Sequence, residues 1–191
     1  SIMFEVKDKA YPTQRINVPD DRKVNPYAED MERIEAETAK INKALRHWRA
    51  SDNVPFNFVW PIEGRVSGLF GRRRVFNGEE RNPHSGIDIA AATGTEIMAP
   101  ANGIVTDTDD YFFNGNTVMI DHGQGLVTMF CHLDRIDVKA GQKIQQGEII
   151  GTVGATGRVT GPHLHLGVSL NNARVEPLLF FPEREGYPSV Q

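Results

Sequence analysis

From Phe56 onwards the chain is a succession of short β-type runs separated by glycine, and this pattern constrains the fold more than any other feature. The runs are rich in valine, isoleucine and threonine, and turn residues bound each of them. They read GIVTDTDD, NTVMIDHG, LVTMFCHL, KIQQGEIIGTVG and HLHLGVSL. No helical stripe of comparable length interrupts them. Residues 56–182 are therefore predicted to form a mostly β domain, built as an antiparallel sandwich or as a partly open, barrel-like sheet.

The first fifty residues have a different character and predict an N-terminal α-helical extension. Residues 1–24 are polar and broken by prolines, which indicates an extended arm. Asn25 is then a candidate N-cap, and Pro26 suits the first helical position. Apolar residues follow at spacings of three, four and seven, so we expect an amphipathic helix over residues 26–49. The stripe consists of Met31, Ile34, Ile41, Leu45 and Trp48.

We interpret this stripe as a packing face, with a partner helix or a dimer interface as the alternative. The segment SDNVP at residues 51–55 breaks the helical pattern. It divides the chain into two parts, an arm with its helix at residues 1–52 and the β domain at residues 53–191.

Composition excludes several classes of function. The net charge is −4 and no long basic run occurs, which argues against a nucleic-acid partner. No stretch approaches the ~20 consecutive apolar residues that a membrane helix needs, so no membrane span is expected in this chain. Because the chain begins with Ser1 rather than Met, we expect that an upstream signal segment was removed, and an upstream domain or anchor is compatible with this start.

Cys131 is the only cysteine, so an internal disulfide and a thiolate zinc cluster are excluded. We interpret Cys131 as a small buried apolar side chain. A nucleophilic role beside His132 is disfavoured, because adjacent residues on a strand point to opposite faces.

Histidines provide the strongest indication of chemistry. His163 and His165 lie two apart in a predicted strand, so their side chains share one face, with α-carbons roughly 6.6 Å from each other. His84 and Asp88 would be about 13 Å apart in a straight strand, but Ser85 and Gly86 between them allow the chain to curl. Two imidazoles and one carboxylate, with a fourth position open for water, are typical of a catalytic zinc site.

This reasoning makes His84 and Asp88 two candidate ligands and takes the third from the His163/His165 pair. The other histidine of the pair would then stand beside the open position. His132 is a further candidate for the site. His122 precedes a turn glycine and is interpreted as structural, or as a substitute ligand if the main assignment fails. His47 is expected on the polar side of the helix.

These residues sit in three blocks that resemble the lysostaphin-type (LytM-like) zinc metallopeptidases, which cut peptidoglycan peptides. The first block is FGRRRVFNGEERNPHSGIDIAAATGTEIMAPANGIV, the second is GNTVMIDHGQGLVTMFCHL and the third is GATGRVTGPHLHLGV. Each short motif is weak alone, but the three in this order are specific together. The resemblance covers roughly residues 56–180, and its implied fold, a mostly antiparallel sheet crossed by a groove, agrees with the strand pattern.

Carried over position by position, the resemblance implies that His84, Asp88 and His165 bind zinc. It implies that His132 and His163 are the catalytic pair. Arg73 matches an arginine near the substrate, with Arg72 as the alternative. Phe130 departs from the family, which commonly has tyrosine two residues before its central histidine, so that hydroxyl is absent here.

The resemblance implies a zinc endopeptidase that hydrolyses the peptide stems of peptidoglycan. The first block is more similar to forms from Gram-negative bacteria, which favours D-alanine–diaminopimelate cross-links and the periplasm. Two other hypotheses are a non-catalytic envelope regulator that activates another wall hydrolase, and a β-rich binding module for glycan or protein. The regulator is disfavoured because all five metal and catalytic positions are filled, and residues 1–52 are expected to dock on the domain, link it to an upstream one or cover its groove.

Overall fold

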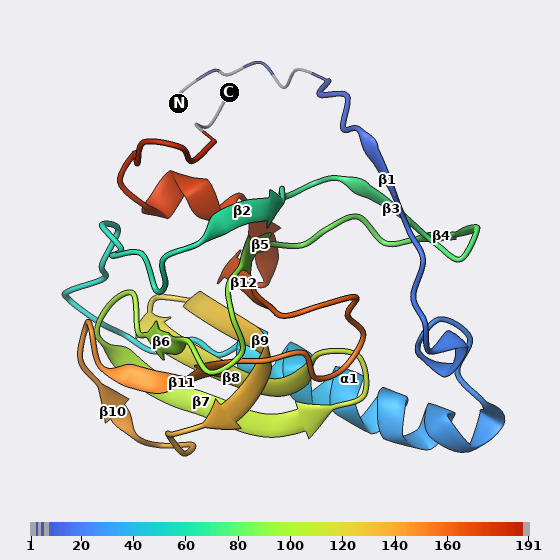
Figure 1. The fold of residues 1–191 in the computed structure, drawn as a ribbon. Helices are drawn as coiled ribbons and strands as arrows, with labels where there is room; N and C mark the ends of the chain where they lie inside the picture. Colours follow the sequence, from blue (N-terminus) through green and yellow to red (C-terminus); the bar gives the residue numbers. More distant parts are fainter. Residues whose placement is uncertain (1–2, 4, 6–7, 189–191) are drawn as a thin grey trace.

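The computed structural model describes residues 3, 5 and 8–188. A strongly curved ten-stranded sheet dominates it, with a three-stranded sheet on one side and an α-helix behind (Figure 1). The strands of the large sheet are β2 (Arg65–Gly68), β5 (Ile87–Ala90), β6 (Glu96–Met98), β7 (Gly103–Tyr111), β8 (Gly115–Gly123), β9 (Leu126–Ile136), β10 (Lys143–Ile144), β11 (Ile149–Val153), β12 (His163–Leu170) and β13 (Ala173–Val175).

The main path of the large sheet runs in the order β10-β7-β8-β9-β12-β5-β2, and every pairing in it is antiparallel. β9 is long enough to pair with different strands along its length. Its first part pairs with β8 and β12, and its last residues pair with β11, which in turn pairs with β6. The sheet therefore curls without closing into a barrel, and the predicted mostly β, antiparallel fold is confirmed.

The five predicted β runs all form strands. Four of them correspond to β7, β8, β9 and β12, whose ends lie within three residues of the runs read from the sequence. The fifth run, residues 143–154, contains both β10 and β11. Short runs of β-type residues bounded by glycine turns were a sufficient signal here, because long antiparallel neighbours bury one or both faces of each strand.

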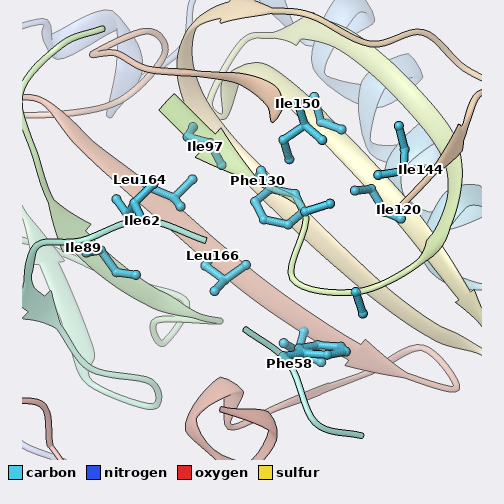
Figure 2. Packing of buried hydrophobic residues seen from close by; sticks show 14 of the residues in the cluster. Phe58, Ile62, Ile89, Ile97, Ile120, Phe130, Ile144, Ile150, Leu164 and Leu166 are labelled. Atoms are coloured by element: carbon cyan, nitrogen blue, oxygen red, sulfur yellow. The ribbon is translucent and has the colours of Figure 1, made fainter. Parts of the chain in front are cut away.

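The main apolar core lies inside the curve of the sheet. Phe130, Leu164 and Leu166 from the central strands meet Ile97 and Ile150 from β6 and β11 (Figure 2). All five are fully buried, and burying such a side chain contributes roughly 1.5–3 kcal/mol. A C-terminal 3-10 turn, η3 (Pro177–Phe180), closes the core at one end through Phe180.

The N-terminal arm is an ordered part of the domain from β1 (Thr13–Ile16) onwards. β1 pairs in parallel with β3 (Arg73–Phe76), which pairs with β4 (Glu79–Arg81) to complete the small sheet. Val18 and Val24 are buried against Phe76, and a short 3-10 turn, η1 (Asp21–Lys23), lies between them. The arm thus runs along the outside of β3 before it reaches the helix (Figure 1).

The helix α1 (Met31–Leu45) is shorter than the predicted span of 26–49, and the predicted N-cap at Asn25 is wrong. The amide of Asn25 instead donates to Glu79 Oε1 at 2.9 Å. A 3-10 turn, η2 (Ala28–Asp30), precedes the helix, because Asp30 accepts hydrogen bonds from Arg22 and from the Tyr27 backbone N–H.

The helix also ends early for a physical reason. After Leu45 the chain turns away, and Arg49 Nε reaches Asp121 Oδ2 at 2.6 Å. Asp121 is fully buried, and a buried carboxylate needs such a partner. Breaking the helix at this point therefore satisfies a charge on β8.

Part of the predicted apolar stripe, Ile41 and Leu45, packs on the back of the large sheet. Ala44 and Leu45, with Ile41 beside them, contact residues of β7, β8 and β9, whereas Met31 and Trp48 at the ends of the stripe are exposed. The sheet residues in this cluster are Tyr111, Met119, Val127, Met129 and Cys131.

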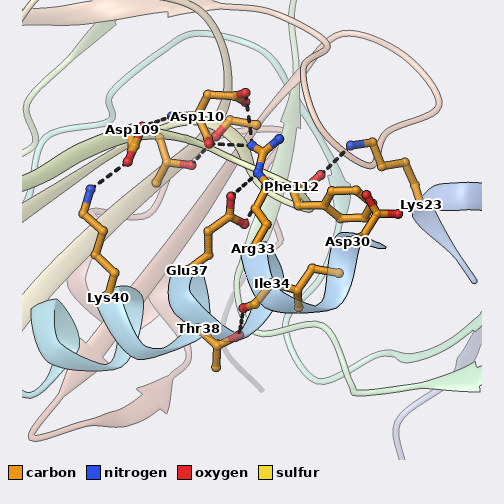
Figure 3. Close-up of polar contacts among 12 residues, drawn as sticks. Lys23, Asp30, Arg33, Ile34, Glu37, Thr38, Lys40, Asp109, Asp110 and Phe112 are labelled. Atoms are coloured by element: carbon orange, nitrogen blue, oxygen red, sulfur yellow. Dashed lines mark hydrogen bonds and ion pairs between the residues drawn. The ribbon is translucent and has the colours of Figure 1, made fainter. Parts of the chain in front are cut away.

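Polar contacts along the sheet-facing side of the helix hold it to the same strands (Figure 3). Arg33 bonds to the Asp110 carbonyl oxygen at 2.8 Å, and Lys40 bonds to Asp109 at 2.7 Å. Glu37 accepts a hydrogen bond from the backbone N–H of Phe112. No helix in the described part of the chain is both long enough and apolar enough to cross a membrane.

Candidate active site

Three residues that the sequence separates by up to 81 positions meet at the edge of β5 and β12. His84 lies just before β5, Asp88 lies on it, and His165 lies on β12 directly opposite Asp88 in the register. The curl predicted between His84 and Asp88 is present at Gly86, where a Cβ atom would collide with the Leu166 carbonyl oxygen. Glycine is required at this close approach, and the approach brings the imidazole back over the carboxylate.

The donor atoms of these three residues converge on one point. His84 Nε2 lies 3.0 Å from Asp88 Oδ1 and 3.0 Å from His165 Nδ1, and His165 Nδ1 lies 2.9 Å from Asp88 Oδ1. His84 donates its Nδ1–H to the Leu69 carbonyl oxygen at 2.8 Å, which leaves the lone pair of Nε2 directed at the cluster. All three side chains are largely buried.

The second oxygen of Asp88 is held from another side. Arg74 of β3 donates an Nη2–H to Asp88 Oδ2 at 2.7 Å, and Gly68 of β2 leaves the room that this oxygen occupies. Burial raises the pKa of Asp88, but the adjoining imidazoles of His165 and His84 outweigh burial and hold that pKa well below its ordinary value. Asp88 is therefore an ionised carboxylate with one oxygen directed at the two imidazoles.

Two further histidines face the same place. His163 shares a strand face with His165, as predicted, and its Nε2 lies 3.8 Å from Asp88 Oδ1. The ring of His132 lies 4.9 Å from the ring of His163, centroid to centroid. Each donates its Nδ1–H to a carbonyl oxygen at 2.8 Å, His132 to Thr156 and His163 to Gly161. Among the described residues neither Nε2 has a hydrogen-bond partner.

His132 owes its position to an irregularity in β9. The register between β8 and β9 shifts at this point, and His132 has a φ of 66°, in the left-handed region. Such a bulge redirects a side chain, and non-glycine residues adopt this conformation rarely. Cys131 correspondingly points away into the cluster beneath α1, where burial raises the pKa of its thiol to about 12.

Burial disfavours the protonated form of two of these imidazoles, those of His132 and His165. Burial lowers the pKa of His132 to about 3, and the neighbouring His163 and His165 act in the same direction. Burial likewise lowers the pKa of His165 to about 4. A neutral imidazole has a lone pair available for a metal ion or for a proton.

The donor set fits a zinc ion. Two imidazoles and one ionised carboxylate converge with no fourth protein donor among the described residues of the cluster, and this is the ligand number of a catalytic rather than a structural zinc site. The bond from His84 to Leu69 also supplies the outer contact that metal-binding histidines usually have.

A groove of about 240 Å³ opens beside this cluster. Its walls come from the β1 side of the small sheet and from the loop that precedes β12, and Asp88, His132 and His163 lie in it. A second hollow of about 370 Å³ adjoins it and reaches His84 and His165. The site is thus open on two sides of His132, which lines both hollows.

The remaining predicted residues lie outside the cluster. Arg73 is exposed and lines a separate hollow between β1 and β4, and neighbouring Arg74 rather than Arg73 bonds to Asp88. His47 is half-exposed, 3.9 Å from Asp121. Phe130 lies in the main core.

His122 is buried and uses both ring nitrogens, on the Asn102 carbonyl oxygen and on Thr128 Oγ1, each at 2.8 Å.

Sequence reasoning expected the arm to dock on the domain or cover its groove, but it did not name Arg74 or the arm residue Gln14 as parts of the site. Three arginines stand in a row at residues 72–74, and the motif alone does not tell which of them turns inward. The pairing of β1 with β3 decides this, since it places Gln14 opposite Arg74 and both line the groove. Alternation along β3 was the available signal, but it required the strand register.

The fold and the cluster define a class of protein that the comparisons identify. Residues 82–177 match the model of Peptidase family M23. The chain belongs to this family, whose members are the LytM/lysostaphin-type peptidases.

Particular relatives are similar over the β domain. The peptidoglycan DD-endopeptidase ShyA of Vibrio cholerae is 42% identical over 118 residues, which are 61% of this chain and 26% of that protein. The DD-carboxypeptidase/endopeptidase Mpg of Neisseria meningitidis is 39% identical over 123 residues, which are 64% of this chain and 28% of that protein. The chain therefore spans about a quarter of the length of these curated relatives.

Solved structures show the same similarity. A peptidase M23 structure from Pseudomonas aeruginosa has a TM-score of 0.72 at 48% identity, covering 80% of this chain and 62% of that one. A zinc-containing peptidase from Vibrio cholerae has a TM-score of 0.59 at 34% identity, covering 63% of this chain and 39% of that one.

Proposed function

We propose that the protein is a zinc-dependent endopeptidase that hydrolyses peptide cross-links of bacterial peptidoglycan. The observation that carries this proposal is the convergence of three ligand atoms beside two imidazoles that each keep a free nitrogen. A merely structural metal site would have no use for that pair. Membership of the M23 family and the DD-endopeptidase relatives support the same reaction class.

We assign the metal to His84, Asp88 and His165. Zinc bound there would lower the pKa of a water molecule and polarise the scissile carbonyl. Leu69 and Arg74 hold the ligands in place, one through the Nδ1–H of His84 and the other through Oδ2 of Asp88.

His132 and His163 are the proposed catalytic pair. Because the Nδ1–H of each is bonded to a backbone carbonyl oxygen, each presents the lone pair of Nε2 to the groove. One imidazole takes the proton of the attacking water at Nε2 and later returns it to the leaving amine. The other, once its Nε2 has taken up a proton from solvent, donates a hydrogen bond to the substrate oxygen. We assign these two roles to His132 and His163 jointly, and either histidine can take either role.

The proposed scissile bond is the D-alanine–diaminopimelate cross-link, and the proposed location is the periplasm of a Gram-negative bacterium. The relatives from Vibrio cholerae and Neisseria meningitidis support this choice, since their names specify DD-endopeptidase activity. Arg73 stays a proposed substrate contact at the outer side of β3. Residues 1–52 are proposed to act with the domain at residues 53–191, on which the arm and helix dock.

The second candidate is a non-catalytic regulator of another wall hydrolase. A relative from Caulobacter vibrioides, 38% identical over 109 residues, is named cell division protein DipM, and this name specifies no peptidase activity. Against it stands the complete set of three ligands and two imidazoles in this chain.

Purified cross-linked sacculi, digested with zinc-loaded protein and with His163→Ala, test the proposal directly. We expect the wild type to convert cross-linked dimers to monomers, with the new termini identified by mass spectrometry, and His163→Ala to leave the dimers intact. Intact dimers with the zinc-loaded wild type would contradict the endopeptidase and favour the regulator.

A further inference from the structure

We propose that Arg158 is a specificity residue that binds a free carboxylate on the peptide stem of the substrate. The inference rests on the proposed function and names which chemical group of the substrate the site selects. Arg158 lies in the loop between β11 and β12, and it lines both the groove beside Asp88 and the hollow beside His84. It therefore stands next to the catalytic site on the side where substrate must lie.

Aromatic rings fix the orientation of this guanidinium. Its Cζ lies 4.8 Å from the ring centroid of Phe76 and 4.5 Å from that of Phe113. Stacking on such rings holds the planar fork in place without using its N–H groups. The backbone N–H of Arg158 also donates to the Phe113 carbonyl oxygen at 2.8 Å, which anchors the loop itself.

The donors of Arg158 are largely unused. A guanidinium has five N–H donors, and the one side-chain hydrogen bond of Arg158 within the described chain is a long one, 3.4 Å from Nη1 to the Lys23 carbonyl oxygen. None of the described carboxylates forms an ion pair with it. Arg74 and Arg81 by contrast each have a carboxylate partner, Asp88 and Glu79 respectively.

The surroundings of Arg158 are electropositive. Among the described residues that line the two hollows, Asp88 is the only carboxylate, and it already faces Arg74 and two imidazoles. Burial lowers the pKa of Arg158 to about 10, and repulsion from Arg74 and Arg81 acts in the same direction. A largely buried cation without a partner is costly, so an anion that enters the groove is stabilised there.

The chemistry of the substrate supplies that anion. Diaminopimelate has two carboxyl groups, so the proposed D-alanine–diaminopimelate cross-link leaves a free carboxylate close to the bond that is cut. A carboxylate matches the fork of a guanidinium through two parallel N–H···O bonds. Amidation of that carboxylate would remove the charge and one acceptor, and we therefore expect the site to reject amidated stems.

The test compares two cross-linked dimers that differ only in amidation of this stem carboxylate. We expect the zinc-loaded wild type to prefer the free acid by about 10- to 100-fold in kcat/KM, the size expected for hydrogen bonds to a charged group. Arg158→Met should lose that preference mainly by losing activity on the free acid. Arg158→Lys keeps the positive charge but not the two parallel N–H donors, so it should keep part of the preference for the free acid.

A structural role for Arg158 predicts a different result. If Arg158→Met lowers kcat/KM by the same factor on both dimers, or if the wild type does not discriminate between them, the assignment is overturned. Arg135→Gln is the matched control, since it removes one exposed arginine that pairs with Asp137, and it should leave the preference intact.

Equilibrium binding of the same two dimers separates this assignment from the proposed function. A wild type that binds the free acid more tightly without cutting it would contradict the endopeptidase but support the carboxylate site. Failure to bind or cut either dimer would overturn both.

Discussion

His122 on β8 and His132 on β9 lie in one sheet and are both buried, but they differ in how their nitrogens are used. His122 bonds through both nitrogens, to the Asn102 carbonyl oxygen and to Thr128 Oγ1. His132 and His163 each bond through Nδ1 alone and present Nε2 to the groove.

Burial alone therefore does not mark a catalytic histidine. Burial lowers the pKa of His122 to about 4 and that of His132 to about 3, so both imidazoles are neutral at neutral pH. The two histidines differ because Nε2 of His132 has a free lone pair with open space beside it, whereas both nitrogens of His122 are bonded. A histidine with both nitrogens bonded stabilises the fold, whereas one with a single anchored nitrogen can exchange a proton.

The largest effect is expected at the metal ligands. His84→Ala or Asp88→Ala removes one of three donors and should abolish both stoichiometric zinc binding and hydrolysis. Zinc content after dialysis, measured by mass spectrometry of the metal, checks this. A variant that retains zinc with wild-type affinity would exclude that residue as a ligand.

The next effect separates the catalytic pair from the ligands. His132→Ala or His163→Ala should lower the rate by about 10²–10⁴-fold, because a general acid or base is lost, while one zinc stays bound. Single-turnover hydrolysis of a cross-linked dimer gives the rate. Activity within a few-fold of the wild type would remove that histidine from the mechanism.

His122→Ala should have the opposite result, with lower stability and unchanged activity. It leaves the Thr128 hydroxyl and the Asn102 carbonyl oxygen without their partner in a buried position, so the free energy of unfolding should fall by about 2–4 kcal/mol. Urea denaturation measures the loss, and kcat at a temperature where the variant is folded should match the wild type. A lower kcat in folded protein would break the contrast between the two kinds of histidine.

The same histidine makes stability depend on pH. The pKa of His122 is lowered by burial to about 4 in the folded state, against an ordinary value of 6.5, so the unfolded chain binds the extra proton between these values. The stabilisation is complete above pH 6.5 and is lost as the pH falls towards 4, by about 2–3 kcal/mol.

Zinc-free His122→Asn should show a correspondingly shallower fall in stability over that range. Urea titrations of both zinc-free proteins at several pH values give the comparison, and the other buried histidines contribute equally to each. Parallel curves for the two proteins would mean that His122 does not titrate in this way.

The smallest effect is expected at Cys131. Its thiol is buried in the cluster under α1 and points away from His132, so Cys131→Ala should cost only about 1 kcal/mol of stability and no activity. Thermal denaturation and the hydrolysis assay check both parts. A large loss of activity would reopen a role for the thiol.

The sequence was most informative where local pattern and pairing agree. Runs of β-type residues bounded by turn residues predicted the main strands of the large sheet, and the spacing of His163 and His165 predicted their common face. The curl between His84 and Asp88 also followed from local chemistry, because Gly86 allows a close approach that no other residue fits.

Features that depend on contacts between different elements of the fold could not be predicted from the sequence. The ends of α1 are set by the pair of Asp30 with Arg22 and the pair of Arg49 with Asp121. The spacing of apolar residues along a helix gives no information about such pairs. The choice of Arg74 over Arg73 as the partner of Asp88 depends on the register of β3. Tertiary contacts overrode local pattern in both cases.

The most direct measurement determines zinc content and hydrolysis of a cross-linked dimer side by side for the wild type, His84→Ala, His163→Ala and His122→Ala. The account predicts zinc and activity in the wild type and His122→Ala, neither in His84→Ala, and zinc without activity in His163→Ala. Loss of zinc from His163→Ala, or loss of activity from folded His122→Ala, would contradict the distinction between a histidine bonded through both nitrogens and one whose free Nε2 acts in catalysis.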